Sequence, residues 1–199
     1  MKVLLAIGAL AAALAVPAVL LLARGGEEVE FRGSRAPDGF TLPAFALRDD
    51  TGRTVRSDAL RGKAVAVTFL DAQCTEACPV IAAQVGQAMR ALGEDRTKIE
   101  ALAGSVDPVH DTSAQIDTFL RRYRAKGELR YLDGTVAQLR PLWKEFAVAA
   151  SQDTGNSNMH SAPVRVYDGE GRWRSTLNPG ADLSPANLVH DLQAALKSS

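Results

Sequence analysis

The sequence predicts an α/β sandwich built on a mixed central sheet. Two short runs, Ala64–Leu70 and Ile99–Val106, are almost wholly apolar, as expected for strands that are buried on both faces. Segments with helical periodicity follow these runs, which is typical of parallel strands joined by helices. Near the C-terminus, Pro163–Tyr167 and Trp173–Thr176 bracket a turn at 168–171. That hairpin adds antiparallel strands, so the sheet is expected to be mixed.

In chain order, the domain is expected to open with a hairpin and then to alternate strands with helices. Phe40–Leu47 and Arg53–Ser57 flank the turn residues 49–52, which predicts an N-terminal hairpin. Apolar residues recur at helical spacing over Cys78–Leu92, and Gly93 ends that helix. The other expected elements are a helix from Thr112 or Ser113 to about Arg124, a strand at Glu128–Leu132, a helix at Thr135–Phe146 and a last helix at Ala186–Leu196 preceded by Ser184-Pro185. This order of elements is that of a thioredoxin-like fold.

The N-terminus carries a candidate membrane segment. Val3 to Ala23 is a run of 21 uncharged residues, long enough to cross about 30 Å of hydrocarbon. A cleaved signal peptide is the competing interpretation, with a small-residue site at 13–15, but the apolar run continues past that site. We therefore expect a signal anchor at residues 1–24, a linker at 25–39 and one domain at 40–199. The domain would lie on the periplasmic side of a bacterial inner membrane.

The charge balance excludes nucleic acid as a partner. The chain of 199 residues has 23 basic and 23 acidic side chains. Lys2 and Arg24 are the only charged residues of the first 24, so the remainder has 21 basic and 23 acidic residues. A faintly acidic domain lacks the basic surface on which nucleic-acid binding depends.

Both cysteines of the chain lie in the segment Cys74-Thr75-Glu76-Ala77-Cys78-Pro79. This segment follows a predicted buried strand and begins a helix, which is where α/β sheets bind ligands. We expect the helix N-terminus to lower the thiol pKa. A spacing of four residues allows both sulfurs to reach one metal ion, or to form a disulfide after a small backbone adjustment. A purely structural disulfide is disfavoured because so short a loop removes little chain entropy.

Three histidines are candidates for a third ligand, since two thiolates favour Cu(I) or Zn²⁺ and an imidazole suits either. His190 lies within the last helix and is expected to be a surface or partly packed histidine. His110 follows the second buried strand, where a supporting role is open. His160 ends the polar loop 151–159 and directly precedes a strand, so it could be placed over the cysteine pair.

With these residues in place, the sequence resembles the Sco/SenC family of copper proteins from about residue 40 to the C-terminus. The resemblance is carried by 68–70 followed by Cys74-x-x-x-Cys78-Pro79, by Ser105-Val106-Asp107-Pro108 with Asp111-Thr112, and by His160-Ser161 with Tyr167-Asp168-x-x-Gly171. Membership implies a thioredoxin-like fold that binds one copper ion, with Cys74, Cys78 and His160 as ligands. It also implies delivery of that copper to the dinuclear copper site of a cytochrome c oxidase subunit, or reduction of the cysteines of that site.

The expected function is therefore that of a membrane-anchored metallochaperone more than an enzyme. The alternative is a thiol–disulfide oxidoreductase in which Cys74 attacks, Cys78 resolves the mixed disulfide and His160 tunes the pKa. Expected partners are the copper-receiving oxidase subunit and either another copper chaperone or a thioredoxin-like reductase.

Three positions depart from the family pattern. Thr75 stands where the family often has proline, and Met159 stands where it often has aspartate. Met159 is expected to be a loop or packing residue, with an extra soft ligand as the other interpretation. Pro163 precedes a strand at the position where thioredoxin-like oxidoreductases keep a cis-proline, which favours thiol–disulfide chemistry.

Overall fold

The computed structural model describes residues 29–148 and 162–198. Its strands form one mixed sheet in the order β1-β8-β7-β4-β5-β6-β2-β3. The three central strands β4, β5 and β6 are parallel, and all other neighbours pair antiparallel. The bounds of the strands are β1 Ser34–Arg35, β2 Ala46–Asp49, β3 Thr54–Arg56, β4 Ala64–Leu70, β5 Ile99–Ser105, β6 Arg130–Asp133, β7 Val164–Tyr167 and β8 Trp173–Leu177. The mixed α/β sandwich predicted from the sequence is confirmed.

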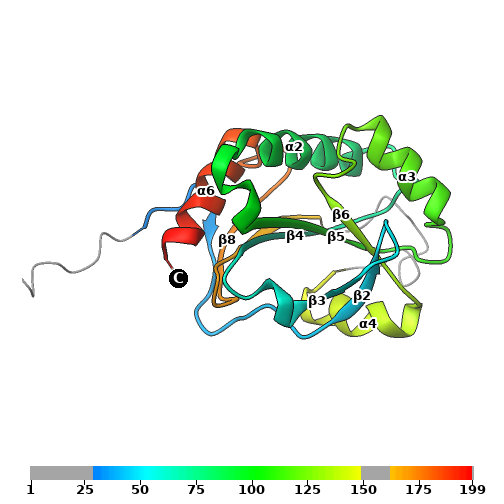
Figure 1. Cartoon of the computed structure of the whole chain (residues 1–199), viewed down its shortest axis with the longest axis horizontal. Helices are drawn as coiled ribbons and strands as arrows, with labels where there is room; N and C mark the ends of the chain where they lie inside the picture. The colour runs from blue at the N-terminus through cyan, green and yellow to red at the C-terminus, as the bar shows by residue number, and fades with distance from the viewer. Residues whose placement is uncertain (1–28, 149–161, 199) are drawn as a thin grey trace, which may run out of the picture. The chain divides into compact units, whose positions relative to one another are not determined.

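Helices cover both faces of the sheet (Figure 1). The helix bounds are α2 Ala77–Ala91, α3 Ser113–Arg122, α4 Val136–Glu145 and α6 Pro185–Lys197, with 3₁₀ turns η1 Ser57–Leu60 and η2 Gly93–Lys98. Side chains of α2, α3 and α6 form one hydrophobic core with the sheet, and that core includes both cysteines. Residues of α4 and η1 form the second core on the opposite face. Every residue of β4 is buried, as a strand covered by helices on both faces requires.

Capping side chains define where the helices begin. Thr112 and Thr135 each accept a hydrogen bond from the backbone N–H three residues later, and the glutamine at that position completes a capping box. Ser184 caps α6 in the same way, with Pro185 at its first position. These helix starts agree with the sequence prediction. By contrast, the side chain of Glu76, the N-cap residue of α2, makes no capping hydrogen bond.

The segment expected as a linker at 25–39 contains a strand. β1 pairs with the edge of β8, and the compact unit of the chain starts at Phe31. The carboxylate of Asp191 on α6 accepts hydrogen bonds from the backbone N–H groups of Arg32 and Gly33 at 2.7 and 3.0 Å. The hydroxyl of Ser175 donates to the same carboxylate at 2.7 Å. Part of the expected linker is therefore fastened to the domain by a buried acid.

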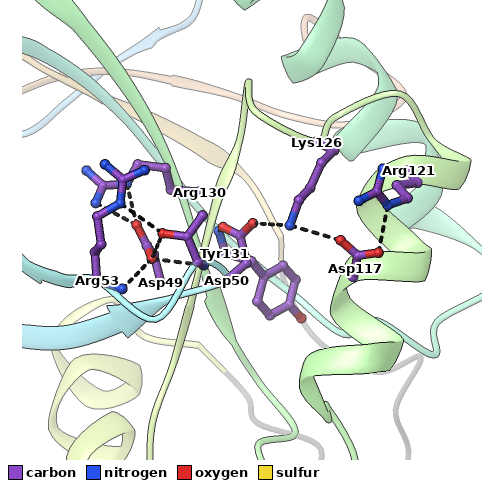
Figure 2. Close-up of polar contacts among 9 residues, drawn as sticks. Asp49, Asp50, Arg53, Asp117, Arg121, Lys126, Arg130 and Tyr131 are labelled. Carbon is purple, nitrogen blue, oxygen red and sulfur yellow. Dashed lines mark hydrogen bonds and ion pairs between the residues drawn. The ribbon is translucent and has the colours of Figure 1, made fainter.

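The β2–β3 hairpin is held against β6 and α3 by charged groups (Figure 2). Asp49 is buried and accepts hydrogen bonds from Arg130 Nε and Nη2 at 3.0 and 2.7 Å. Asp50 accepts from the backbone N–H of Tyr131 at 3.1 Å and from Lys126 at 2.8 Å, and Lys126 also pairs with Asp117. Asp50 thereby holds the backbone of Tyr131. The hydroxyl of Tyr131 contacts the carbonyl of Leu70, directly before the connection that carries Cys74.

Two further expectations concern a membrane span at the N-terminus and the peptide bond before Pro163. None of the helices within residues 29–148 and 162–198 has the length and apolar character of a membrane span. The anchor expected at residues 1–24 lies outside the described residues. The peptide bonds of the described residues are all trans, including the one between Ala162 and Pro163.

Candidate metal-binding and redox site

The two cysteines lie at the carboxyl end of β4, between the sheet and α2. Cys74 belongs to the connection 71–76, and Cys78 is in the first turn of α2. Both side chains are buried, with Cys74 5% and Cys78 0% exposed, and no disulfide joins the two thiols. The sequence prediction that the pair lies after a buried strand and at a helix start is confirmed.

The side chains of Cys78 and Cys74 share a hydrogen bond, which shows that the two thiols are direct neighbours. Burial raises the pKa of the Cys78 thiol far above its ordinary value, although a backbone hydrogen bond from Asp71 acts in the opposite direction. The expectation that the helix N-terminus lowers the thiol pKa is therefore wrong for Cys78. Desolvation of a thiolate inside an apolar core outweighs the favourable dipole there.

Two aspartates hold the backbone of the cysteine segment. The N–H groups of Ala72 and Gln73 donate to the carboxylates of Asp111 and Asp71, at 2.9 and 2.7 Å. The N–H of Cys74 donates to the backbone carbonyl of Asp71 at 3.2 Å. The amides of Ala72 and Gln73 are therefore bound by carboxylates, and the amide of Cys74 by a backbone carbonyl, not by a sheet ladder.

A third acid, Asp107, lies at the end of β5 together with His110. The Nδ1 atom of His110 lies 2.9 Å from Oδ2 of Asp107, and the hydrogen bond to this carboxylate raises the pKa of the imidazole. The second oxygen of Asp107, Oδ1, is buried with no hydrogen-bond partner among the described residues. Most of the His110 side chain is exposed. Among the described residues, His110 is hydrogen-bonded to a carboxylate at the sheet edge that carries the cysteines. This arrangement fits the supporting role at the site that the sequence left open.

The other candidate residues are distributed as follows. His190 lies on α6 and contacts Asp191, its neighbour in sequence, at 3.1 Å, as expected for a helix-surface histidine. His160 and Met159 lie outside the described residues, so their roles stay predictions. Within residues 29–148 and 162–198, no three His, Cys, Asp or Glu side chains gather as a metal site.

Paired thiols of this kind suit two chemistries. Two adjacent sulfurs provide soft ligands that select Cu(I) or Zn²⁺ over hard cations. The same two sulfurs, already in hydrogen-bond contact, can alternate between dithiol and disulfide. The residues present therefore fit a soft metal ion, and they equally fit a redox pair.

Sequence reasoning gave no role to the polar residues around the thiols. These residues are Asp71, Ser105, Asp107, Asp111 and Tyr131. Asp71 directly follows the buried run of β4, and Asp107 and Asp111 follow that of β5. The rule that ligand-binding residues gather at the carboxyl ends of strands could have brought the three acids together before the structure. Tyr131 gave no such signal.

Comparisons with known proteins assign a family. The sequence model of the SCO1/SenC family matches residues 34–197. The SCO1 protein homolog of Bacillus subtilis is 23% identical over 105 residues, which cover 53% of this chain and 52% of that relative. The chain therefore spans about half the length of this curated relative.

Two solved structures have similar folds. The structure of Bradyrhizobium japonicum ScoI with copper bound is 27% identical, with a TM-score of 0.66, and the match covers 78% of this chain and 99% of that one. BsSco, a member of the Sco family of cytochrome c oxidase assembly proteins in which a disulfide switch was identified, has a TM-score of 0.70. It is 18% identical, and the match covers 83% of this chain and 98% of that one.

Proposed function

Because the chain belongs to the SCO1/SenC family, we propose that it binds one copper ion through Cys74, Cys78 and His160. We propose further that it passes this copper to the dinuclear copper site of a cytochrome c oxidase subunit. The observation that carries the proposal is the pair of buried, reduced and mutually hydrogen-bonded thiols at the end of β4. Copper bound to the ScoI relative supports the choice of metal.

Copper is the cargo of this site, and the chain supplies soft ligands and a dry environment for it. Two thiolates favour Cu(I), and His160 would complete the set of three ligands. Because the Cys78 thiol resists ionisation inside the core, copper must displace its proton on binding. We therefore expect the affinity for copper to fall as the pH is lowered. The recipient would take the ion by exchanging its own ligands for these.

A second function is favoured by a specific observation, the state of the two thiols. As a dithiol, the pair could reduce a disulfide in the copper site of the recipient. The Cys74 thiolate would attack one sulfur of that disulfide, and Cys78 would then displace the partner's thiolate. The partner would gain two electrons and two thiols, and Cys74 and Cys78 would become a disulfide. Cys74 is assigned the attacking role because it is the more exposed of the two. The disulfide switch of BsSco is consistent with such a cycle.

We propose that residues 1–24 anchor the chain in a bacterial inner membrane by a single span, with the domain on the periplasmic side. The uncharged run from Val3 to Ala23 supports this placement. In that compartment, either another copper chaperone would load the site or a thioredoxin-like reductase would keep its thiols reduced.

A copper titration separates the two functions. The full chain in detergent is reduced without oxygen and titrated with Cu(I) against a competing chelator. One tight equivalent is expected for the wild type and for the control His190→Ala, and its loss is expected for Cys74→Ser and for His160→Ala. Weak binding that is indifferent to His160→Ala, together with reduction of test disulfides by the wild type, would contradict copper delivery and establish the reductase.

A further inference from the structure

Asp111 is buried at the end of the loop between β5 and α3, directly before the N-cap Thr112, and both of its oxygens are bound. Its Oδ1 accepts the backbone N–H of Ala72 at 2.9 Å. Its Oδ2 lies 2.6 Å from the hydroxyl of Ser105 and 2.7 Å from the hydroxyl of Tyr131. The Tyr131 hydroxyl also lies 2.7 Å from the carbonyl oxygen of Leu70. Asp111 therefore joins the ends of β4, β5 and β6.

The number of protons shared by Asp111 and its hydrogen-bond partners decides whether its carboxyl group is charged. Three short oxygen–oxygen contacts link Ser105, Asp111, Tyr131 and the Leu70 carbonyl. Each such contact needs one proton between its two oxygens, because two unprotonated oxygens at this distance repel each other. The hydroxyls of Ser105 and Tyr131 supply two protons, and a backbone carbonyl supplies none. The third proton must belong to the carboxyl group of Asp111.

The directions of the three hydrogen bonds follow from this count. Ser105 donates to Oδ2 of Asp111, and its own oxygen accepts the backbone N–H of Asp107 at 3.1 Å. The carboxyl proton of Asp111 then goes to the Tyr131 oxygen, which leaves the Tyr131 proton for the Leu70 carbonyl. Every polar atom of the cluster is satisfied in this arrangement.

We infer that Asp111 is held as a neutral carboxylic acid that donates to Tyr131, and that in this form it is a positioning residue for the segment carrying Cys74. The inference rests on the proposed function, since it concerns how the copper-binding thiols are held. In the neutral form, which dominates below about pH 6, Asp111 binds the Ala72 amide and connects three strands without adding a negative charge behind the two sulfurs.

The surroundings of Asp111 favour the neutral form. Burial raises the pKa of this carboxyl to about 6, although the hydrogen bonds that the Ser105 hydroxyl and the Ala72 amide donate to it act in the opposite direction. The charge of Asp71 at the end of β4 raises it further. Of the other titratable groups nearby, Asp107 and His110 belong to the loop of Asp111 itself, and Cys78 of α2 acts on Tyr131. No hydrogen bond to Asp111 from the described residues comes from a Lys or Arg.

The raised pKa of Asp111 determines how the stability of the fold changes with pH. A carboxyl whose pKa is higher in the folded than in the unfolded chain stabilises the fold fully below the unfolded value of 3.8. This stabilisation is lost as the pH rises through the folded value of about 6. The variant Asp111→Asn keeps the acceptor for Ala72 and a donor for Tyr131, but it cannot ionise. It also loses the acceptor for the Ser105 hydroxyl, at a cost that does not change with pH.

The test uses the full chain in detergent, free of metal, so that its result does not depend on copper binding. Urea unfolding is measured from pH 4 to pH 8 for the wild type, Asp111→Asn and the exposed control Asp58→Asn. The unfolding constant of the wild type is expected to rise about 100-fold relative to Asp111→Asn over this range, since two pKa units separate the two states. If the unfolding constants of the wild type and Asp111→Asn change in parallel with pH, the inference that Asp111 is neutral is wrong. The absence, at pH 5, of a carboxylic-acid C=O infrared band that Asp111→Asn removes would also overturn it.

The positioning role is read from the reactivity of Cys74. The rate of its alkylation at pH 5 is measured by peptide mass in the wild type, Asp111→Asn and Asp111→Ala. Asp111→Ala releases the Ala72 amide, so alkylation of Cys74 is expected to be at least 10-fold faster, while Asp111→Asn stays near the wild-type rate. Equal rates in all three proteins would overturn the positioning role. A wild type that shows these effects but binds no copper would refute the proposed function alone.

Discussion

Removal of Arg130 tests whether the hairpin network contributes to stability. Burial by itself would raise the pKa of Asp49, but hydrogen bonds from Thr51, from Arg130 and from the backbone of Arg53 lower it to about 2. Relative to the ordinary value of 3.8, this shift of almost two units corresponds to about 2 kcal/mol of stability at neutral pH. Arg130→Met removes two of the hydrogen bonds to a buried carboxylate, so we expect it to cost about 2 kcal/mol.

The matched control is Arg56→Met. Arg56 pairs with Asp58 at 2.7 Å, the same distance as Arg130 and Asp49, but both partners are more than 60% exposed. Solvent screens an exposed pair of this kind, so Arg56→Met is expected to be nearly neutral. The shortest distance is the same in the two ion pairs, and their burial differs strongly.

Urea unfolding followed by circular dichroism measures both variants, at pH 6 and at lower pH. The lowered pKa of Asp49 provides stability that is present above pH 3.8 and lost as the pH falls toward 2. The cost of Arg130→Met should therefore shrink as the medium is acidified. Equal costs for Arg130→Met and Arg56→Met at pH 6 would refute the reasoning, as would a cost of Arg130→Met that does not change with pH.

Three further predictions concern buried groups. In Cys74→Ser, the remaining Cys78 should react with an alkylating reagent at pH 8 at least 100-fold more slowly than after unfolding in urea, because it is fully buried and its pKa is raised; similar rates would contradict this. Asp191→Ala should cost about 2–4 kcal/mol in urea unfolding, because two buried donors and one partly buried donor lose their acceptor. A cost below about 1 kcal/mol would contradict the role of Asp191 in holding the N-terminal segment. Tyr131→Phe should cost about 1–2 kcal/mol in the same assay, and the half-buried Tyr123→Phe is its control, expected to cost less.

Much of the fold could be predicted because the signals are local. The apolar run of β4 was placed at its observed bounds, since a strand covered on both faces must be apolar throughout. Thr112, Thr135 and Ser184 mark helix starts through hydrogen bonds within four residues of the chain. β1 could not be predicted. It is two residues long, and what holds it is the edge of β8 and the side chain of Asp191, both far along the chain.

The site was predicted in part for the same reason. Cys74 and Cys78 are close in sequence, so their pairing could be inferred from spacing. The pKa of Cys78 could not, because it depends on how completely α2 and the sheet exclude water from the sulfur. Tyr131 was missed because its role comes from its hydroxyl, which contacts the Leu70 carbonyl at the end of β4 and Asp111 in the loop after β5. The pattern of β6 indicates only a buried strand.

The position of the cysteine segment therefore depends on the sheet as well as on the Cys-x-x-x-Cys spacing. The amides of Ala72, Gln73 and Cys74 are bound by Asp71 and Asp111, while the Glu76 side chain provides no cap for α2. Asp111 in turn depends on Tyr131, and the backbone of Tyr131 is bound by Asp50 of the hairpin. The same spacing on another sheet would lack the acids that hold the segment. It follows that substitutions in the hairpin network, which touch neither sulfur, should alter the reactivity of Cys74.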